Sequence, residues 1–202
     1  SFSGYRIHDG RTDREILSVS SPVRIRIGAC QSHEKDGCNF PMTFQVATSN
    51  LAPGLYYLEA EAREPILTTP VFFNVRYPYK SVSRPQKVLL VPTFTWHAYN
   101  QIGGGSLYTQ KVDPMRVSTL RPLLPNVADY HSPGATLAFS RFFHKLGIPH
   151  RTIDSLDLHS DSTILEGAQT LILAGHDEYW TKEMVNHTRN FVEAGGQLVV
   201  FS

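Results

Sequence analysis

The sequence predicts a mixed α/β protein in which a β-rich module precedes a doubly wound parallel sheet. Three observations support this class. Short β-rich runs with turn signals fill residues 1–78, strands alternate with helices from residue 87 onward, and the stretch 77–85 between them carries two prolines and polar spacers. The predicted organisation is therefore a sandwich-like module over 1–78, a linker over 79–86 and an α/β domain over 87–202.

The first module is predicted to be an antiparallel β-sandwich. Residues 23–27 and 43–47 alternate apolar and polar side chains, which is the period of a half-buried strand. A further strand at 55–60 follows a Pro-Gly turn, and another is expected at 71–75. None of these runs collects the residue types of an active site, so scaffolding or partner contact is the expected task.

The second part alternates strands and helices in the order of a doubly wound sheet. The predicted strands are 88–91, 150–154, 171–174 and 198–201, and the predicted helices are 135–146, 162–166 and 181–193. Thr181 is a candidate N-cap for the last helix, and Gly195-Gly196 ends it. If the strand order is flavodoxin-like, the first and third strands are neighbours and a ligand site lies between their carboxyl ends.

Titratable and aromatic side chains gather at that edge. His176 and Glu178 follow the third predicted strand, and Tyr99 lies in the loop after the first. The glycine run 103–105 lets Tyr108 fold back toward Tyr99. Simple capping of the following helix is an equally good explanation for the acidic residues here.

Several chemistries are excluded or disfavoured by the residue types present. No cysteine follows Cys38, which excludes a thiol nucleophile from the α/β part, and no GxSxG elbow is present. A set of Ser106, His176 and Asp177 is disfavoured because adjacent His and Asp side chains cannot easily form the orienting hydrogen bond. A phosphate site at 103–105 lacks the GxxxxGK[ST] order.

Phenolate and carboxylate oxygens offer another chemistry. Tyr99, Tyr108 and Glu178 together would be hard anionic ligands suited to a small, highly charged ion such as ferric iron. The commoner arrangement of tyrosines is a core position with a satisfied hydroxyl, and the residues alone leave both readings open.

The composition limits the choice of partners. A net charge of +1 argues against a nucleic-acid surface, and no apolar run approaches the ~18 residues of a membrane helix. A small-molecule or protein partner is expected. No signal peptide is visible, which leaves localisation open and favours the cytoplasm. Cys30 and Cys38 suit either a hairpin-bridging disulfide or two separate thiols.

Six sequence blocks in one order are similar to the motif series of the N,N-dimethylformamidase large-subunit family. The blocks are 93–100, 103–108, 120–122, 155–159, 175–180 and 194–196, read as TFTWHAYN, GGGSLY, LRP, SLDLH, GHDEYW and AGG. The resemblance covers roughly residues 87–202. It implies a glutamine-amidotransferase-like α/β fold and a mononuclear ferric ion held by two tyrosines and a glutamate.

Motif by motif, the resemblance places these ligands on Tyr99, Tyr108 and Glu178, with the family's nearby histidine on His176. Tyr130 is the reserve candidate for the second tyrosine. The implied activity is hydrolysis of a small-molecule amide, in which the metal polarises the carbonyl or activates water and His176 handles a proton. The identity of the amide does not carry over.

The last predicted strand raises a separate expectation. A sheet ending at its fourth strand would expose an edge and an apolar face. We therefore expect the parallel sheet to be incomplete in this chain and to be completed by a second polypeptide. One alternative is cleavage after Ser202, which would give the partner chain an N-terminal nucleophile. The other is a non-catalytic binding module that kept the fold and lost the site.

Overall fold

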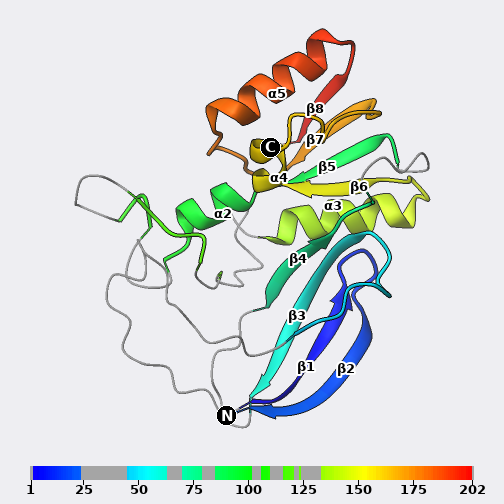
Figure 1. Cartoon of the computed structure of the whole chain (residues 1–202), viewed down its shortest axis with the longest axis vertical. Helices are drawn as coiled ribbons and strands as arrows, with labels where there is room; N and C mark the ends of the chain where they lie inside the picture. The colour runs from blue at the N-terminus through cyan, green and yellow to red at the C-terminus, as the bar shows by residue number, and fades with distance from the viewer. Residues whose placement is uncertain are drawn as a thin grey trace.

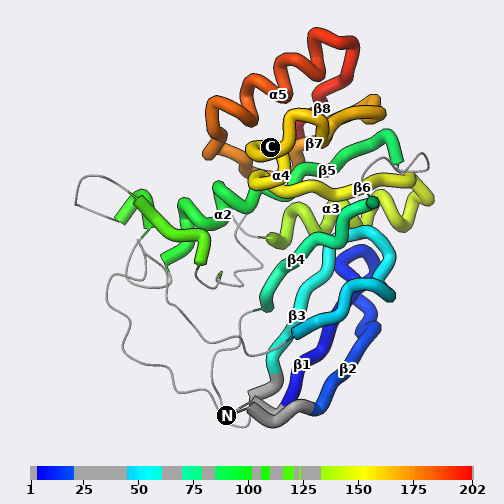
Figure 2. Tube along the Cα trace, in the orientation of Figure 1, coloured from blue at the N-terminus to red at the C-terminus, as the bar shows by residue number. Residues whose placement is uncertain are grey.

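The computed structural model describes residues 2–23, 45–62, 70–78, 85–101, 106–109, 116–120, 123 and 133–201. These residues form two four-stranded sheets, one antiparallel and one parallel, with helices packed on the second (Figure 1). The chain trace in Figure 2 completes the first sheet before it enters the second. The mixed α/β class is thereby confirmed.

The antiparallel sheet has the strand order β2-β1-β3-β4. Its strands are β1 (Phe2–Asp9), β2 (Arg14–Val23), β3 (Gly54–Ala62) and β4 (Val71–Val75). Alternate residues of neighbouring strands form its core, with Tyr5 and Ile7 from β1 packed with Tyr56 and Leu58 from β3. One face of this sheet is therefore buried.

The predicted strands at 55–60 and 71–75 are confirmed as parts of β3 and β4. Residues 45–47 lie in no strand, contrary to the prediction, and residues 24–27, 43 and 44 lie outside the described residues. The described β-rich part is a single sheet, so the sandwich stays a prediction.

The parallel sheet has the strand order β6-β5-β7-β8. Its strands are β5 (Lys87–Val91), β6 (Arg151–Asp154), β7 (Thr170–Ala174) and β8 (Gln197–Phe201), and its helices are α2 (Thr93–Tyr99), α3 (Pro133–Lys145), α4 (Ser155–Ser160) and α5 (Lys182–Glu193). The first and third strands of this part, β5 and β7, are neighbours, as predicted. The carboxyl ends of β5 and β7 therefore meet at one edge.

Helices cover both faces of the parallel sheet. Val88 and Leu90 of β5 face a core that includes Met184 of α5, whereas Leu89 between them packs with Phe143 of α3. This alternation explains why the central strands read as continuous apolar runs. In Figure 1, α5 and α3 lie on opposite faces of the sheet, and α3 lies between the two sheets.

Polar contacts from α3, and others directly between β4 and β6, join the two sheets. The Arg141 guanidinium donates to Asp13 at 2.6 Å and to the Gly10 carbonyl at 3.1 Å. Next to α3, the Asn74 amide of β4 donates to the Thr152 carbonyl of β6 at 2.8 Å. The antiparallel sheet thus buttresses the face of the parallel sheet that carries α3. Residues 79–84 of the predicted linker lie outside the described residues.

Two helices differ from the prediction. The predicted helix at 162–166 is a series of turns, and a short helix, α4, precedes it. A capping box explains the shift, because Asp154 accepts the N–H of Asp157 at 2.8 Å and Asp157 accepts that of Asp154 at 3.2 Å. The second difference is α2, which lies in a stretch expected to have little regular structure.

Candidate functional site

The first segment of the site is α2, which starts directly after β5. Thr95 and Tyr99 are four residues apart on this helix and therefore lie on the same face, one turn apart. Thr95 is fully buried, and Trp96 anchors the helix by packing edge-on against Phe72 of β4. The buried base of α2 places the Tyr99 ring at the carboxyl edge of the sheet.

The second segment is the turn at 106–109. Its Leu107 N–H donates to the Ala98 carbonyl of α2 at 2.9 Å. Inside the turn, the Thr109 hydroxyl accepts the N–H of Ser106 at 2.8 Å, and the Ser106 hydroxyl accepts that of Tyr108 at 3.2 Å. The Tyr108 ring consequently stacks on the Tyr99 ring, with centroids 4.4 Å apart.

The third segment follows β7. Gly175 has a φ of +88°, a left-handed conformation that favours glycine, and its N–H donates to the Phe201 carbonyl of β8 at 2.8 Å. The chain then turns so that the N–H groups of Glu178 and Tyr179 both donate to the Thr95 hydroxyl, at 3.0 and 3.1 Å. A single buried hydroxyl on α2 therefore holds this loop.

Together the three segments converge on one carboxylate oxygen. Glu178 Oε2 lies 2.6 Å from the Tyr99 hydroxyl, 2.8 Å from the Tyr108 hydroxyl and 3.0 Å from His176 Nε2. The two hydroxyls are 2.7 Å apart, and His176 Nε2 lies 3.2 Å from that of Tyr99. The structure thus brings together all four site residues predicted from the sequence. We call Tyr99, Tyr108 and Glu178 the oxygen cluster.

The electrostatics of the oxygen cluster separate the carboxylate from the phenols. Hydrogen bonds from Tyr99, Tyr108 and His176 lower the pKa of Glu178 to about 2. Desolvation and the bond to Glu178 raise the pKa of Tyr99. For Tyr108, a hydrogen bond with Tyr179 lowers the pKa, but Tyr99, desolvation and Glu178 together raise it to about 12. Near neutral pH the cluster therefore carries one negative charge, held by two protonated phenols.

Tyr179 is a site residue that the sequence analysis missed. Its hydroxyl is hydrogen-bonded to that of Tyr108, and its ring lies edge-on to the Tyr99–Tyr108 stack, at centroid distances of 6.3 and 6.4 Å. Desolvation and the bond to Tyr108 raise the pKa of Tyr179. Its position directly after Glu178 in an aromatic-rich block was the available signal.

Asp177 turns away from the oxygen cluster. Its Oδ1 accepts the Thr95 hydroxyl at 3.2 Å, and its Oδ2 is buried without a hydrogen-bond partner among the described residues. Desolvation raises the pKa of Asp177 to about 6, although hydrogen bonds from Thr95 and Trp180 oppose the shift. Asp177 is thus a half-buried acid whose protonated form is stabilised relative to that of a free aspartate.

This shift predicts a pH dependence of stability. The folded-state pKa of Asp177, about 6, exceeds the ordinary aspartate value of 3.8, so its proton stabilises the folded state below about pH 4, and this contribution is lost as pH rises through about 6. Between pH 4 and pH 7, the unfolding free energy of the parent should therefore fall by on the order of 2–3 kcal/mol more than that of Asp177→Asn, which lacks this carboxyl. Urea unfolding of metal-free protein at both pH values measures this difference. Parallel pH profiles for the variant and the parent would contradict it.

Other candidates from the sequence fall elsewhere. Tyr130, the glycines at 103–105, Cys30 and Cys38 lie outside the described residues. The Ser106 hydroxyl serves the turn that carries Tyr108, as described above. In the described part of the chain, no three His, Cys, Asp or Glu side chains gather into a metal-binding group. Two of the three proposed donors in the oxygen cluster are tyrosine oxygens, which such a group would not include.

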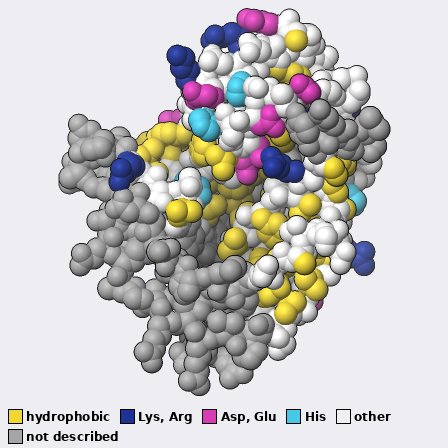
Figure 3. Space-filling view, viewed as in Figure 1, with side chains coloured by type: hydrophobic (Ala, Val, Ile, Leu, Met, Phe, Trp, Pro, Cys, Tyr) yellow, Lys and Arg dark blue, Asp and Glu magenta, His cyan; other side chains and the backbone are white. Residues whose placement is uncertain are grey.

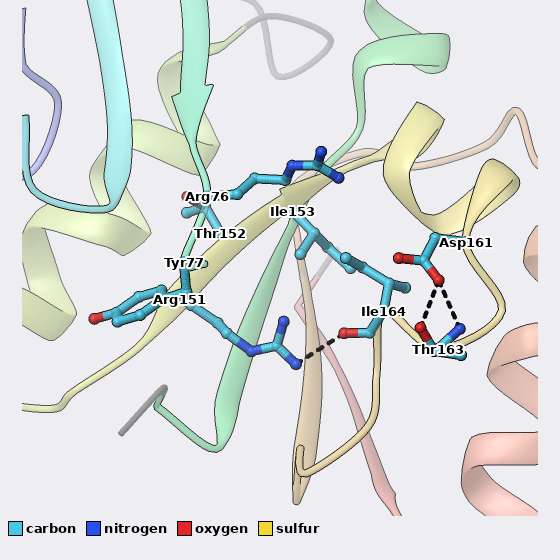
Figure 4. A pocket seen from close by; sticks show the side chains of 8 residues that line it. All are labelled: Arg76, Tyr77, Arg151, Thr152, Ile153, Asp161, Thr163 and Ile164. Carbon is cyan, nitrogen blue, oxygen red and sulfur yellow. Dashed lines mark hydrogen bonds between the residues drawn. The ribbon is translucent and has the colours of Figure 1, made fainter. Parts of the chain in front are cut away.

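Three cavities lined by described residues accompany these elements. One of about 250 Å³ adjoins the oxygen cluster and is lined in part by Tyr179. Another, of about 140 Å³, lies between the end of β4, β6 and the turns after α4 (Figure 4). The third, of about 680 Å³, lies among the turns before β7 and β8, at the opposite edge of the sheet from the oxygen cluster. Only the first is next to the predicted chemistry.

The cavity in Figure 4 is lined by two arginines that point in different directions. Arg76 pairs with Asp157 at 2.8 Å, whereas Arg151 donates to the Ile164 carbonyl at 2.9 Å. Because the two guanidinium groups do not converge on a common point, they do not form an anion-binding pair. We assign Arg76 to joining the end of β4 to α4, and Arg151 to joining β6 to the turns after α4.

The distribution of charge on the molecular surface bears on the classes of partner. On the face shown in Figure 3, the basic side chains of the described residues lie in several separate places rather than in one patch. Such a pattern differs from the clustered Lys and Arg that follow a phosphate backbone. Among the described helices, none has the length and apolar character needed to cross a bilayer.

A comparison with protein families found one matching model. It is described as N,N-dimethylformamidase beta subunit-like, C-terminal, and it matches residues 2–202. The match includes the antiparallel sheet, which extends the resemblance beyond the motif blocks of residues 87–202. No curated protein matches the chain.

Proposed function

Because the chain belongs to the N,N-dimethylformamidase beta subunit-like family, we propose that it is the site-bearing chain of a hydrolase that cleaves an amide C–N bond. The observation that carries this proposal is the oxygen cluster, in which two phenols and a histidine converge on one carboxylate oxygen. Perturbed titratable groups that converge at the switch point of an open α/β sheet are characteristic of functional sites.

The donor set of the oxygen cluster fits a ferric ion. Tyr99, Tyr108 and Glu178 present three oxygens within 2.8 Å of one another, and the Tyr108 and Glu178 side chains are about half exposed, so an ion can reach them. Two tyrosinates and a carboxylate would give three negative charges, which matches a hard trivalent cation. When bound, such an ion supplies Lewis acidity, which polarises a carbonyl or lowers the pKa of water.

Each residue has a distinct proposed role. The phenols Tyr99 and Tyr108 release their protons to become ligands, and Glu178 is already ionised near neutral pH because its pKa is lowered to about 2. As a ligand, Glu178 is not available as a free base. His176, whose Nε2 donates to the ionised Glu178 Oε2 at 3.0 Å, lies beside the oxygen cluster, and its imidazole is proposed to take up a proton from an attacking water and to return it to the departing amine.

Iron content and colour test this proposal. Tyrosinate bound to ferric iron absorbs visible light, so concentrated protein loaded with iron should be coloured and contain about one iron per site. Tyr99→Phe should remove much of the colour, whereas Tyr57→Phe, on the antiparallel sheet, should leave it unchanged. Colourless, iron-free protein that still hydrolyses amides would contradict the metal assignment.

The edge strand β8 supports the proposal of a second polypeptide. Leu198, Val200 and Phe201 are 42%, 55% and 47% exposed, although the strand is as apolar as the buried β7. Alternate residues on both faces of β8 are thus available for packing, as they are in an interior strand. We propose that a further parallel strand, from a partner chain or from another part of the protein, packs here and completes the domain.

The native mass of the active enzyme tests the two-chain assembly. A complex larger than one chain, containing a second polypeptide, is the expected result, and a fully active 22.7 kDa monomer would contradict it. N-terminal sequencing of the second chain then addresses the alternative mechanism. A partner that begins with Ser, Thr or Cys, and that loses activity when this residue is changed to Ala, would favour an N-terminal nucleophile.

A further inference from the structure

The cavity beside the oxygen cluster is lined by the three segments that carry the proposed ligands and by residues of a fourth segment, 116–120. Its volume is about 250 Å³, and its walls include Phe94 and Ala98 from α2, Leu107 from the turn, Val117, and Tyr179 and Trp180 from the loop after β7. Each of the three proposed ligands therefore has a direct neighbour in the chain that lines this cavity. The packing of α2, the turn at 106–109 and the loop after β7 therefore both positions the proposed ligands and forms most of the cavity wall.

Tyr179 connects the cavity to the chemistry. Its ring lies edge-on to the Tyr99–Tyr108 stack, at centroid distances of 6.3 and 6.4 Å, and its hydroxyl is hydrogen-bonded to that of Tyr108. The same residue is part of the cavity wall. The same side chain therefore borders both the cavity and the oxygen cluster.

The character of the cavity restricts what it can hold. Its lining is mainly aliphatic and aromatic; the other lining residues are His97, Thr119 and Thr181, and the described lining includes no carboxylate, ammonium or guanidinium group. A charged group there would lose its hydration and gain at most an imidazole and hydroxyl groups as partners, whereas an apolar group gains by leaving water. At the ~30 Å³ that a water molecule occupies in the liquid, the volume corresponds to roughly eight non-hydrogen atoms.

We propose that this cavity binds the apolar substituent of the amide substrate, so that the preferred substrates are amides with a branched-alkyl or aryl group. The proposal rests on the amide-hydrolase function proposed above. Two methyl groups would fill only a small part of the cavity. Each additional methylene that it buries should raise kcat/KM by about fourfold, which corresponds to ~0.8 kcal/mol per CH₂.

A graded series of formamides tests this inference. The series N,N-dimethyl-, N,N-diethyl- and N,N-dibutylformamide, with N-benzyl-N-methylformamide, should show rising kcat/KM, and N-(2-hydroxyethyl)-N-methylformamide should fall below its apolar analogue. Filling the cavity with Val117→Trp should reduce the dibutyl-to-dimethyl ratio of kcat/KM to about one. Val71→Trp, on an exposed residue of β4, is the matched control and should leave the ratio unchanged. Thr119→Trp, from another part of the wall, serves if the first variant does not fold.

Binding measurements separate this inference from the proposed function. In protein carrying Glu178→Gln, calorimetry should give dissociation constants that tighten along the same series, and Val117→Trp should abolish the trend. Tightening without hydrolysis of any amide by the parent protein would support the cavity and overturn the amide-hydrolase function. Hydrolysis of dimethylformamide with no trend in either kcat/KM or binding would overturn the cavity proposal and leave the function standing.

Discussion

Replacing Glu178 with Gln should lower kcat/KM for amide hydrolysis by at least about 100-fold. The amide keeps the size of the side chain but removes the negative charge on which Tyr99, Tyr108 and His176 converge. Changes in groups that merely support metal ligands already reduce affinity or activity by 10–100-fold, so loss of a charged ligand should have a larger effect. Initial rates and bound iron, measured on the same samples, provide the test.

Stability is expected to change little, because the Glu178 side chain is 44% exposed. Glu166→Gln, on an exposed turn after α4, makes the same chemical change away from the site and should keep full activity. An iron-loaded Glu178→Gln enzyme with parental kcat/KM would exclude Glu178 as a ligand.

The metal-free protein gives an independent readout of the same substitution. The hydrogen bond with Tyr179, which lowers the pKa of Tyr108, is retained in this variant. The contribution of Glu178, which helps to raise that pKa to about 12, is removed. Tyrosinate absorbance should therefore appear at lower pH in Glu178→Gln than in the parent, and this shift would locate Glu178 beside Tyr108 in solution even if no iron bound.

The meeting of Tyr99 with His176 and Glu178 could be predicted because it depends on topology. Two buried apolar runs joined by crossover helices form parallel strands, and neighbouring parallel strands end at the same edge. β5 and β7 have this relationship, so residues 77 and 79 positions apart come within 3.2 Å. The position of Tyr108, by contrast, was indicated only by a glycine run and by the family resemblance.

Local signals were insufficient where tertiary contacts decide the structure. The sequence of α2 is rich in aromatic and β-branched residues with low helix propensity, and its helical form is supported by burial of Trp96 against the antiparallel sheet. The hairpin β1–β2 was missed although Tyr5 and Ile7 alternate and an Asp-Gly pair follows them. There the signal was present in the sequence.

The role of Thr95 could not be predicted because its three partners are 82, 83 and 84 residues away. Nothing in the local sequence distinguishes it from Thr93, two residues earlier. In the structure, its hydroxyl accepts the N–H groups of Glu178 and Tyr179 and donates to Asp177. Thr95 is therefore a positioning residue that joins α2, which carries one proposed ligand, to the loop that carries another.

Thr95→Val should consequently impair both stability and metal binding. Valine keeps the shape of the side chain but leaves two backbone N–H groups without their acceptor, and each unsatisfied buried group costs about 1–3 kcal/mol. We expect the unfolding free energy to fall by about 2–4 kcal/mol. The affinity for iron should fall by about 10–100-fold, because the loop that presents Glu178 loses its anchor.

Two matched variants separate positioning from general destabilisation. Thr95→Ser retains the hydroxyl and should restore iron affinity. Thr136→Val, at a fully buried threonine of α3 whose hydroxyl has no hydrogen-bond partner among the described residues, should be neutral or stabilising. Restoring the visible band should take less excess iron in Thr95→Val than in Glu178→Gln, because a misplaced ligand can still bind whereas a missing one cannot. Parental iron affinity in Thr95→Val would show that Glu178 is held in place by other contacts.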